Sequence, residues 1–281
     1  MKTTTRYPSS NPIIHSATPG AKRHLIAAMT SVAVGLAAGP AHAVTFDINT
    51  ADDFVNPGDG VCSVREALIA SSTGVPSGNV PGECPAGAGV DTLDLSAITN
   101  QTITLLGAQP LEVAAGLDIT VDGQGVTIDA GGNSRVLELG LGVSFEASDL
   151  NFENGFTTDR GGAIVGEEVT LTLVGGSVLN SVAGGKGGGI FMTESTVSIT
   201  QTFISGNTAG NLQPGELGGG LAIEIGTLEM TGVTVQQNSV AGAAGFGGGI
   251  SAVAATVTLD GVGLIDNDAP TAGGLLLAFL D

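Results

Sequence analysis

The segment TVSITQTFISGN, residues 196–207, recurs twice further along the chain without a gap. The later copies are TLEMTGVTVQQN at residues 227–238 and TVTLDGVGLIDN at residues 256–267. In each copy apolar side chains alternate with polar ones, as in Val197, Ser198 and Ile199. This two-residue period is typical of a half-buried β-strand. No helix-length period interrupts the alternation, so the copies predict repeated short strands.

Glycine-rich blocks that end in an aliphatic residue mark the same period. The aliphatic markers lie 26, 31, 29 and 25 residues apart, and an asparagine precedes each block at intervals of 26, 27, 31 and 29 residues. The markers are Ile164, Ile190, Leu221, Ile250 and Leu275, and the asparagines are Asn154, Asn180, Asn207, Asn238 and Asn267. Two features that keep step through five cycles indicate a repeat array.

The repeat predicts an all-β fold, a right-handed parallel β-helix with three short strands in each turn of the solenoid, or rung. Such strands stack in register about 4.8 Å apart. A propeller or an up-and-down barrel fits less well, because the repeat is too short for a four-stranded blade. We expect the repeats to span residues 101–281, after an N-terminal cap region at residues 44–100.

The asparagine column predicts a structural ladder. Identical Asn side chains on stacked rungs can hydrogen-bond along the solenoid axis. Asn also tolerates the left-handed backbone of a sharp corner. We expect all five asparagines to stack in one ladder, and we assign them no catalytic role.

One turn in each repeat varies in length. From an aliphatic marker to the next asparagine the distance is 16 or 17 residues, whereas from an asparagine to the next marker it is 10, 10, 14, 12 and 8 residues. Variable turns in solenoids project from one side and often form the binding face. Arg160, Lys186, Leu217 and Phe246, each four positions before a marker, are therefore a candidate binding ridge. Ordinary surface turns are the alternative interpretation.

The first 43 residues have the organisation of a secretory signal peptide. Lys-Arg-His at residues 22–24 precedes an apolar run over residues 25–39, and Ala-His-Ala at residues 41–43 is a small-x-small cleavage site. The apolar run is short for a membrane span, and no second candidate span follows it. We expect an exported protein, extracellular or on a bacterial outer-membrane surface, with no membrane span in its mature part. An uncleaved membrane anchor is the alternative.

Removal of this leader changes the chemistry that the chain offers. The leader carries four of the eight Lys and Arg residues, all three His residues, the single Tyr and none of the 27 acidic residues. Four basic residues then face 27 acidic ones, which is a formal net charge of −23. Such a surface repels nucleic acids and anionic membranes, so we expect neither as a partner. Without His, we expect neither a Ser-His-Asp triad nor a zinc enzyme.

Two cysteines remain in the mature part, Cys62 and Cys84, and export favours their oxidation to a disulfide. In the chain-entropy model a bridge across a loop of about 20 residues stabilises the fold by roughly 3 kcal/mol. Two free thiols are the alternative. Ser63 and Glu66 have the Ser-x-x-Glu spacing of a helix capping box. We expect a short amphipathic helix, held by the disulfide, to cover the first rung.

The segment CSVREAL, residues 62–68, closely resembles the Cys-Ser-Leu-Arg-Glu-Ala motif of the CSLREA-domain proteins. The resemblance extends to Gly-Asp-Gly at residues 58–60 and GVDTL at residues 89–93. The later aliphatic-x-x-Asn units resemble the repeats of polymorphic outer-membrane proteins, which are autotransporter-passenger-like and have Phe at the aliphatic position. Together these resemblances cover most of residues 44–281. They imply an exported bacterial β-helix and supply no catalytic residue.

A loop before this motif is rich in hard oxygen ligands. Asp52, Asp53 and Asp59, with Asn56 beside them, are candidate calcium ligands in a Gly/Pro-containing segment. The spacing does not match an EF-hand loop, and a solvated acidic turn is the alternative. Calcium is the one cofactor that the sequence suggests.

The C-terminal segment LLLAFLD, residues 275–281, begins another rung and does not cap it. We expect either that the natural chain continues beyond this point or that the open rung associates with a second copy of the chain.

These features favour a non-enzymatic exported or surface protein, adhesin-like or scaffolding, that binds a surface glycan or a protein through its variable turns. The alternative is a polysaccharide-cleaving enzyme, pectate-lyase-like or a glycoside hydrolase, which rests on fold analogy. Three or more acids that converge with Arg135 or Arg160 in one cleft would favour the enzyme, and acids spread along the stack would oppose it. The acids near these arginines in sequence are Asp122, Asp129, Asp149 and Asp159.

Overall fold

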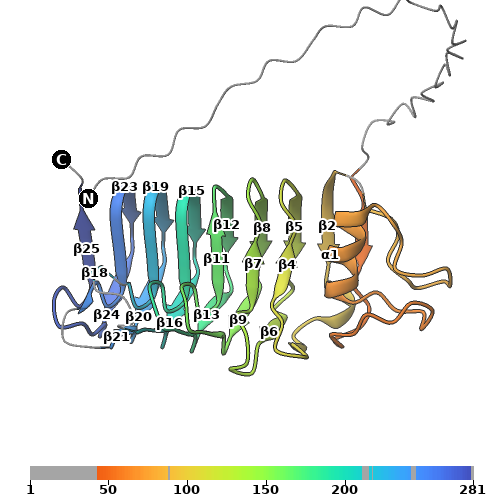
Figure 1. The fold of residues 1–281 in the computed structure, drawn as a ribbon, viewed down its shortest axis with the longest axis horizontal. Helices are drawn as coiled ribbons and strands as arrows, with labels where there is room; N and C mark the ends of the chain where they lie inside the picture. Colours follow the sequence, from red (N-terminus) through yellow and green to blue (C-terminus); the bar gives the residue numbers. More distant parts are fainter. Residues whose placement is uncertain (1–42, 88, 211–214, 217, 242–244, 280–281) are drawn as a thin grey trace, which may run out of the picture. The chain divides into compact units, whose positions relative to one another are not determined.

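The computed structural model describes residues 43–87, 89–210, 215–216, 218–241 and 245–279. In this part of the chain every strand pairing is parallel, and the strands stack as the rungs of a β-helix (Figure 1). The predicted fold is therefore confirmed. The expected signal peptide at residues 1–43 lies, except for Ala43, outside the described residues.

Three faces make up each rung. The first face contains β4 (Leu111–Val113), β7 (Leu137–Leu139), β11 (Ile164–Glu167), β25 (Leu275–Ala278) and the first halves of β15 (Ile190–Thr200), β19 (Leu221–Thr231) and β23 (Ile250–Asp260). The second face contains β1 (Thr45–Asp47), β2 (Val90–Asp94), β5 (Asp118–Asp122), β8 (Ser144–Ser148), β12 (Thr170–Val174) and the second halves of β15, β19 and β23. The second face thus begins within the region that the sequence assigned to the cap.

The third face is a seven-stranded sheet. It contains β3 (Thr102–Thr104), β6 (Thr127–Asp129), β9 (Asn151–Glu153), β13 (Ser177–Leu179), β16 (Phe203–Ser205), β20 (Thr234–Gln236) and β24 (Gly263–Ile265). Two short ladders follow it in the variable turns, β10 (Phe156–Thr157) with β14 (Val182–Ala183), β17 (Thr208–Ala209) and β21 (Ser239–Val240), and β18 (Gly215–Glu216) with β22 (Gly245–Phe246). The variable turns therefore stack on one another as well.

The aliphatic markers form one buried column. Ile164, Ile190, Leu221 and Ile250 are register partners on successive rungs, and none of them is exposed. Leu275 continues the register and is partly exposed on the last described rung. The alternation predicted from sequence therefore places one apolar residue of each strand in a common core.

The glycine blocks are required by the corner that precedes the first face. Gly187 has φ of +66°, in the left-handed region, where a Cβ is unfavourable. A Cβ on Gly188 would lie 2.3 Å from the carbonyl oxygen of Gly219 on the next rung. The first glycine therefore turns the chain, and the second allows two backbones to approach closely.

The asparagine column is two columns, so the prediction of a five-membered ladder is wrong. Asn207 donates through Nδ2 to Oδ1 of Asn238 at 3.0 Å, and Asn238 donates in the same way to Asn267 at 3.0 Å. Asn154 and Asn180 lie one position earlier in the register, at a corner where φ is +54° and +52°. The interval of 27 residues between Asn180 and Asn207, where the rung measures 26, is this change of column.

At the ladder position of the preceding rungs the chain has Ser181 and Gly155. The backbone N–H of Ser181 donates to Oδ1 of Asn207 at 2.9 Å, and Ser181 Oγ accepts from the backbone N–H of Gly155 at 3.0 Å. A hydroxyl thus continues the ladder where Asn is absent. The left-handed tolerance of Asn explains Asn154 and Asn180, and its hydrogen-bonding capacity explains the other three.

The predicted capping helix is confirmed as α1 (Val64–Thr73), which lies beside the first strands (Figure 1). Ser63 and Glu66 form the complete capping box, and Cys62 and Cys84 form the disulfide with a Cα–Cα distance of 4.8 Å. No described helix has the length and apolarity that crossing a membrane requires.

Candidate ligand-binding site

The outward side chains of the first face change character along the stack. One register column runs from Glu112 on β4 through Glu138 on β7 and Val165 on β11 to Phe191 on β15. Both glutamates are exposed, whereas Phe191 is buried. Arg160 lies over this ring, and the turn before β15 passes close to the residue, because a Cβ on Gly187 would lie 2.9 Å from the Cβ of Phe191. The outward surface of β4, β7 and β11, which we call the open surface, is thus bordered by α1 and by this turn.

Of the four Lys and Arg residues in the described part of the chain, three border the open surface. Arg135 precedes β7, Arg160 lies in the turn before β11, and Lys186 lies in the turn before β15. The backbone N–H of Gly161 donates to the carbonyl oxygen of Lys186 at 2.9 Å, so these two turns are neighbours. Most of the scarce positive charge of an acidic chain is therefore gathered on adjacent rungs.

Arg135 holds the edge of this surface together. Its Nε donates to the carbonyl oxygens of Arg160 and Gly161, at 3.1 Å each. Its guanidinium also forms ion pairs with Glu138 at 3.3 Å and, more distantly, with Asp159 at 3.9 Å. With these partners the side chain is only 18% exposed. Arg135 is thus a link between two rungs, and little of it can reach a ligand.

Arg160 is arranged differently. Its Cζ lies 4.6 Å from the ring centroid of Phe191, a cation–π distance that holds the side chain over the ring. Arg160 also forms an ion pair with Asp159, in which Nε lies 3.7 Å from Oδ1, a distance too long for a hydrogen bond. The side chain is 45% exposed, and its guanidinium has no hydrogen bond within the described residues. Arg160 therefore presents free N–H donors from an oriented position.

A shallow depression lies beneath Arg160 on the open surface. It has a volume of about 210 Å³. Carboxylates of Glu138 and Glu167 line it, together with the apolar side chains of Leu141 and Val165. The depression thus combines hydrogen-bond donors, acceptors and an apolar floor in one place.

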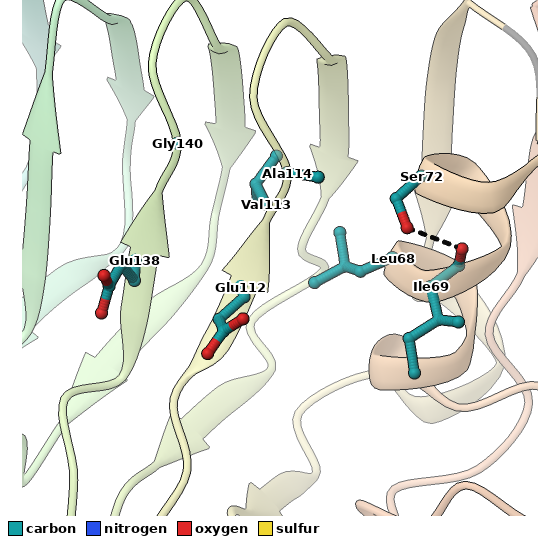
Figure 2. A pocket seen from close by; sticks show the side chains of 8 residues that line it. All are labelled: Leu68, Ile69, Ser72, Glu112, Val113, Ala114, Glu138 and Gly140. Carbon is teal, nitrogen blue, oxygen red and sulfur yellow. Dashed lines mark hydrogen bonds between the residues drawn. The ribbon is translucent and has the colours of Figure 1, made fainter.

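A second depression separates α1 from β4 and β7, and Figure 2 shows it. Leu68 and Ile69 approach it from the helix, and Glu112 and Glu138 present their carboxylates on neighbouring strands. Ser72 is not free to act there as a donor, because its hydroxyl donates to the carbonyl oxygen of Ile69 at 2.9 Å. Its volume is about 310 Å³. Glu138 lines both depressions, so they adjoin on the open surface.

The predicted binding ridge is only partly available to a ligand. Lys186 forms an ion pair with Glu224 on β19 and is 20% exposed. Phe246 is half-buried and pairs with Glu216 of the neighbouring turn. Leu217 lies outside the described residues. Within the described part of the ridge, Arg160 is the member that faces solvent with unused donors.

Of the acids named near the two arginines in sequence, Asp159 alone lies beside them. Asp122 lies on the second face, and Asp149 occupies a left-handed corner. Asp129 pairs in register with Glu153 on the third face and accepts a hydrogen bond from Asn154 at 2.9 Å. Burial, and secondarily the charge of Asp129, raises the pKa of Glu153.

The residues that sequence reasoning missed are Glu138, Glu167 and Phe191. Phe191 directly follows an aliphatic marker, and Glu138 occupies the same register position two rungs earlier. The signal was present, because a residue next to an inward marker must point outward on the same strand. Aligning the first rungs required the strand register, which the degenerate sequence before Ile164 does not reveal.

The three candidate calcium ligands Asp52, Asp53 and Asp59 have separate hydrogen-bond partners. Both oxygens of Asp53 are occupied by Arg65, at 2.7 and 2.8 Å, and one also accepts from the backbone N–H of Leu106. Asp52 accepts from Thr50, and Asp59 accepts from the backbone of Val61. The described residues contain no group of three or more side chains placed to hold a metal ion.

A different carboxylate organises this loop. Glu83 accepts hydrogen bonds from the backbone N–H groups of Gly58 and Gly60 and from the hydroxyl of Ser77. The bond from Gly60 is the largest cause that lowers the pKa of Glu83, followed by the bond from Ser77. The backbone of the loop with the candidate calcium ligands is therefore held by the Glu83 carboxylate, which accepts hydrogen bonds from its N–H groups.

Comparisons of the chain with protein-family models, with curated proteins and with solved structures found no match. The function is therefore argued from the site itself.

Proposed function

We propose that this protein is an exported, non-enzymatic β-helix that binds a surface glycan or a protein on the open surface, as an adhesin-like or scaffolding module. The observation that carries the proposal is the position of Arg160. Arg160 is an exposed basic residue in a variable turn. It lines a depression on the open surface, next to the outward side chains of β7 and β11. Variable turns next to a rigid sheet are where solenoids place recognition.

Export is part of the proposal. The Cys62–Cys84 disulfide supports it, because disulfides persist in oxidising compartments. The signal-peptide pattern of the first 43 residues and the CSLREA-like segment also support it. The family resemblance itself is a proposal, founded on residues 62–68 and on the repeat units.

Polysaccharide cleavage is the second candidate, and one observation favours it. Glu138 and Glu167 line the same depression as Arg160, and paired carboxylates can act as acid and base on a glycosidic bond. Asp159 also lies beside Arg160, but it is ion-paired with Arg135 and Arg160. The other acids near the two arginines in sequence lie elsewhere, so we favour binding over turnover.

The test uses the secreted protein without its leader, immobilised and probed with arrays of glycans and extracellular-matrix proteins. In parallel, the same glycans are incubated with the protein, and reducing ends and unsaturated products are measured. We expect saturable binding of at least one class and no product release. Product release from any polysaccharide would replace the binding function with the enzymatic one, and absence of binding to every class would overturn the proposal.

A further inference from the structure

The chemistry of the depression under Arg160 restricts what it can accept. The charged side chains that line it are those of Arg160, Glu138 and Glu167. Two of them have an ion-pair partner outside the lining, because Glu138 pairs with Arg135 and Arg160 pairs with Asp159. An anionic group would meet the guanidinium at the cost of repulsion from both acids, on a mature chain of net charge −23. A cationic group would meet the acids and be repelled by Arg160. Neither charge is complemented across the whole depression.

Hydroxyl groups satisfy both kinds of lining side chain. A hydroxyl donates one hydrogen bond and accepts others, whereas a guanidinium only donates and a carboxylate only accepts. A ligand with several neighbouring hydroxyls can therefore accept from Arg160 while it donates to Glu138 and Glu167. Bonds of this kind to ionised groups are the stronger class of hydrogen bond.

The floor and the size of the depression point the same way. Val165 and Leu141, the latter 53% exposed, provide apolar surface between the charged groups. A volume of about 210 Å³ is below the range of about 300–1,000 Å³ usual for whole small-molecule sites. The depression therefore suits one ring of a longer chain, with C–H groups against the floor and hydroxyls at the rim.

We infer that the depression formed by Glu138, Arg160 and Glu167 is a subsite for one uncharged sugar unit of a neutral polysaccharide. This inference rests on the proposed binding function and specifies its ligand. Arg160 is the donor and is held by Phe191, and Glu138 is held by Arg135, so two of the three polar groups are oriented before the ligand arrives. Such preorganisation reduces the entropy that binding costs.

The test measures binding of the secreted protein to neutral oligosaccharides and to uronate oligosaccharides of equal length, at low and high NaCl. Wild-type protein is compared with Glu138→Gln, Glu167→Gln and Arg160→Gln. The matched control is Glu229→Gln, an exposed glutamate on β19 outside the depression. Thermal unfolding of every variant confirms that it folds.

We expect neutral oligosaccharides to bind with little dependence on salt, and each variant in the depression to weaken binding about tenfold or more. The control should bind as the wild type does. Preference for uronates, or stronger binding by the two Glu→Gln variants, would overturn the neutral-sugar subsite. Binding that no variant alters would also overturn it while the proposed function stands. Wild-type protein that binds nothing on the arrays fails the proposed function instead.

Discussion

The side chains of Asn207, Asn238 and Asn267 each join neighbouring rungs through hydrogen bonds. Asn238 donates to Oδ1 of Asn267 and to the carbonyl oxygen of Ile204, and it accepts from both the backbone and the side chain of Asn207. Asn207 and Asn238 are fully buried. Loss of such a group leaves several buried donors and acceptors unpaired at once.

We predict that Asn238→Ala lowers the free energy of unfolding by about 2–4 kcal/mol, because an unsatisfied buried polar group costs about 1–3 kcal/mol. Chemical denaturation measures it. The matched control is Asn180→Gly, at an exposed corner with φ of +52°, where glycine is at ease. The control should change stability by only a few tenths of a kcal/mol. Equal losses in the two variants would contradict the division into two columns.

Glu153 makes a prediction about pH. Its pKa in the folded chain is raised, so between the unfolded and the folded pKa the native state binds more protons than the unfolded one. The contribution of Glu153 to the free energy of unfolding is therefore favourable at acidic pH, and it is lost as the pH rises through the pKa of Glu153 in the folded chain. Glu153→Gln should stabilise the protein at pH 7, because the neutral amide removes the cost of burying a charge and, secondarily, the repulsion from Asp129. The like-charge part alone is about 0.2–1 kcal/mol.

The same variant should show no gain well below the ordinary pKa of glutamate, where both forms are neutral. Thermal unfolding at several pH values compares it with Glu146→Gln, an exposed glutamate on β8. A gain from Glu153→Gln that is equally large at acidic pH would show that charge is not its cause.

At the scale of elements, the cap is tied to the solenoid by Arg65. This residue of α1 binds Asp53 with two nitrogens, and it donates to the carbonyl oxygens of Gln109 and Pro110 before β4. The Asp53 side chain is 1% exposed. The arginine therefore neutralises a buried carboxylate and joins three segments that are distant in sequence.

We predict that Arg65→Met destabilises the protein by about 3–5 kcal/mol, because it strands a buried charge. The double variant Arg65→Met with Asp53→Asn should recover part of this loss, since no unpaired charge remains. Denaturation of the two variants is compared with wild-type protein. A double variant no more stable than the single one would contradict the ion-pair account.

Much of this element-scale structure follows from local patterns. The aliphatic markers predict the core column, and Ser63 with Glu66 predicts where α1 begins. The division of the asparagines into two columns could not be predicted from the sequence. The interval from Asn180 to Asn207 differs from the length of the rung by only one residue. A shift of one residue exchanges inward and outward positions on a strand. The open surface was missed for a related reason, since Glu138 lies in early rungs without the glycine block.

At the scale of the molecule, the first and second faces offer opposite surfaces. On the second face Thr170, Thr196, Thr227 and Thr256 form one register column, and Thr and Ser are also the commonest residues of the next outward column. A third outward column contains Asp47, Asp94, Asp122 and Asp260. β-Branched residues suit such a pleated surface. The first face has charged groups and depressions between α1 and the turn before β15. We therefore propose that recognition takes place on the first face only.

On the last described rung, β25 pairs with residues 250–253 of β23, and Leu277 is 43% exposed. Association of this rung with a second copy remains a prediction. Dilution would separate such association from ligand binding, because binding on the open surface is independent of protein concentration.

The most direct test of the proposed binding site is amide hydrogen–deuterium exchange of the protein without residues 1–43, with and without the best ligand from the arrays. Protection is expected in residues 135–141 and 157–167, which frame the depression under Arg160, and no change is expected in residues 170–174 and 196–200 of the second face. Protection confined to the second face, with residues 135–141 and 157–167 unchanged, would contradict the account.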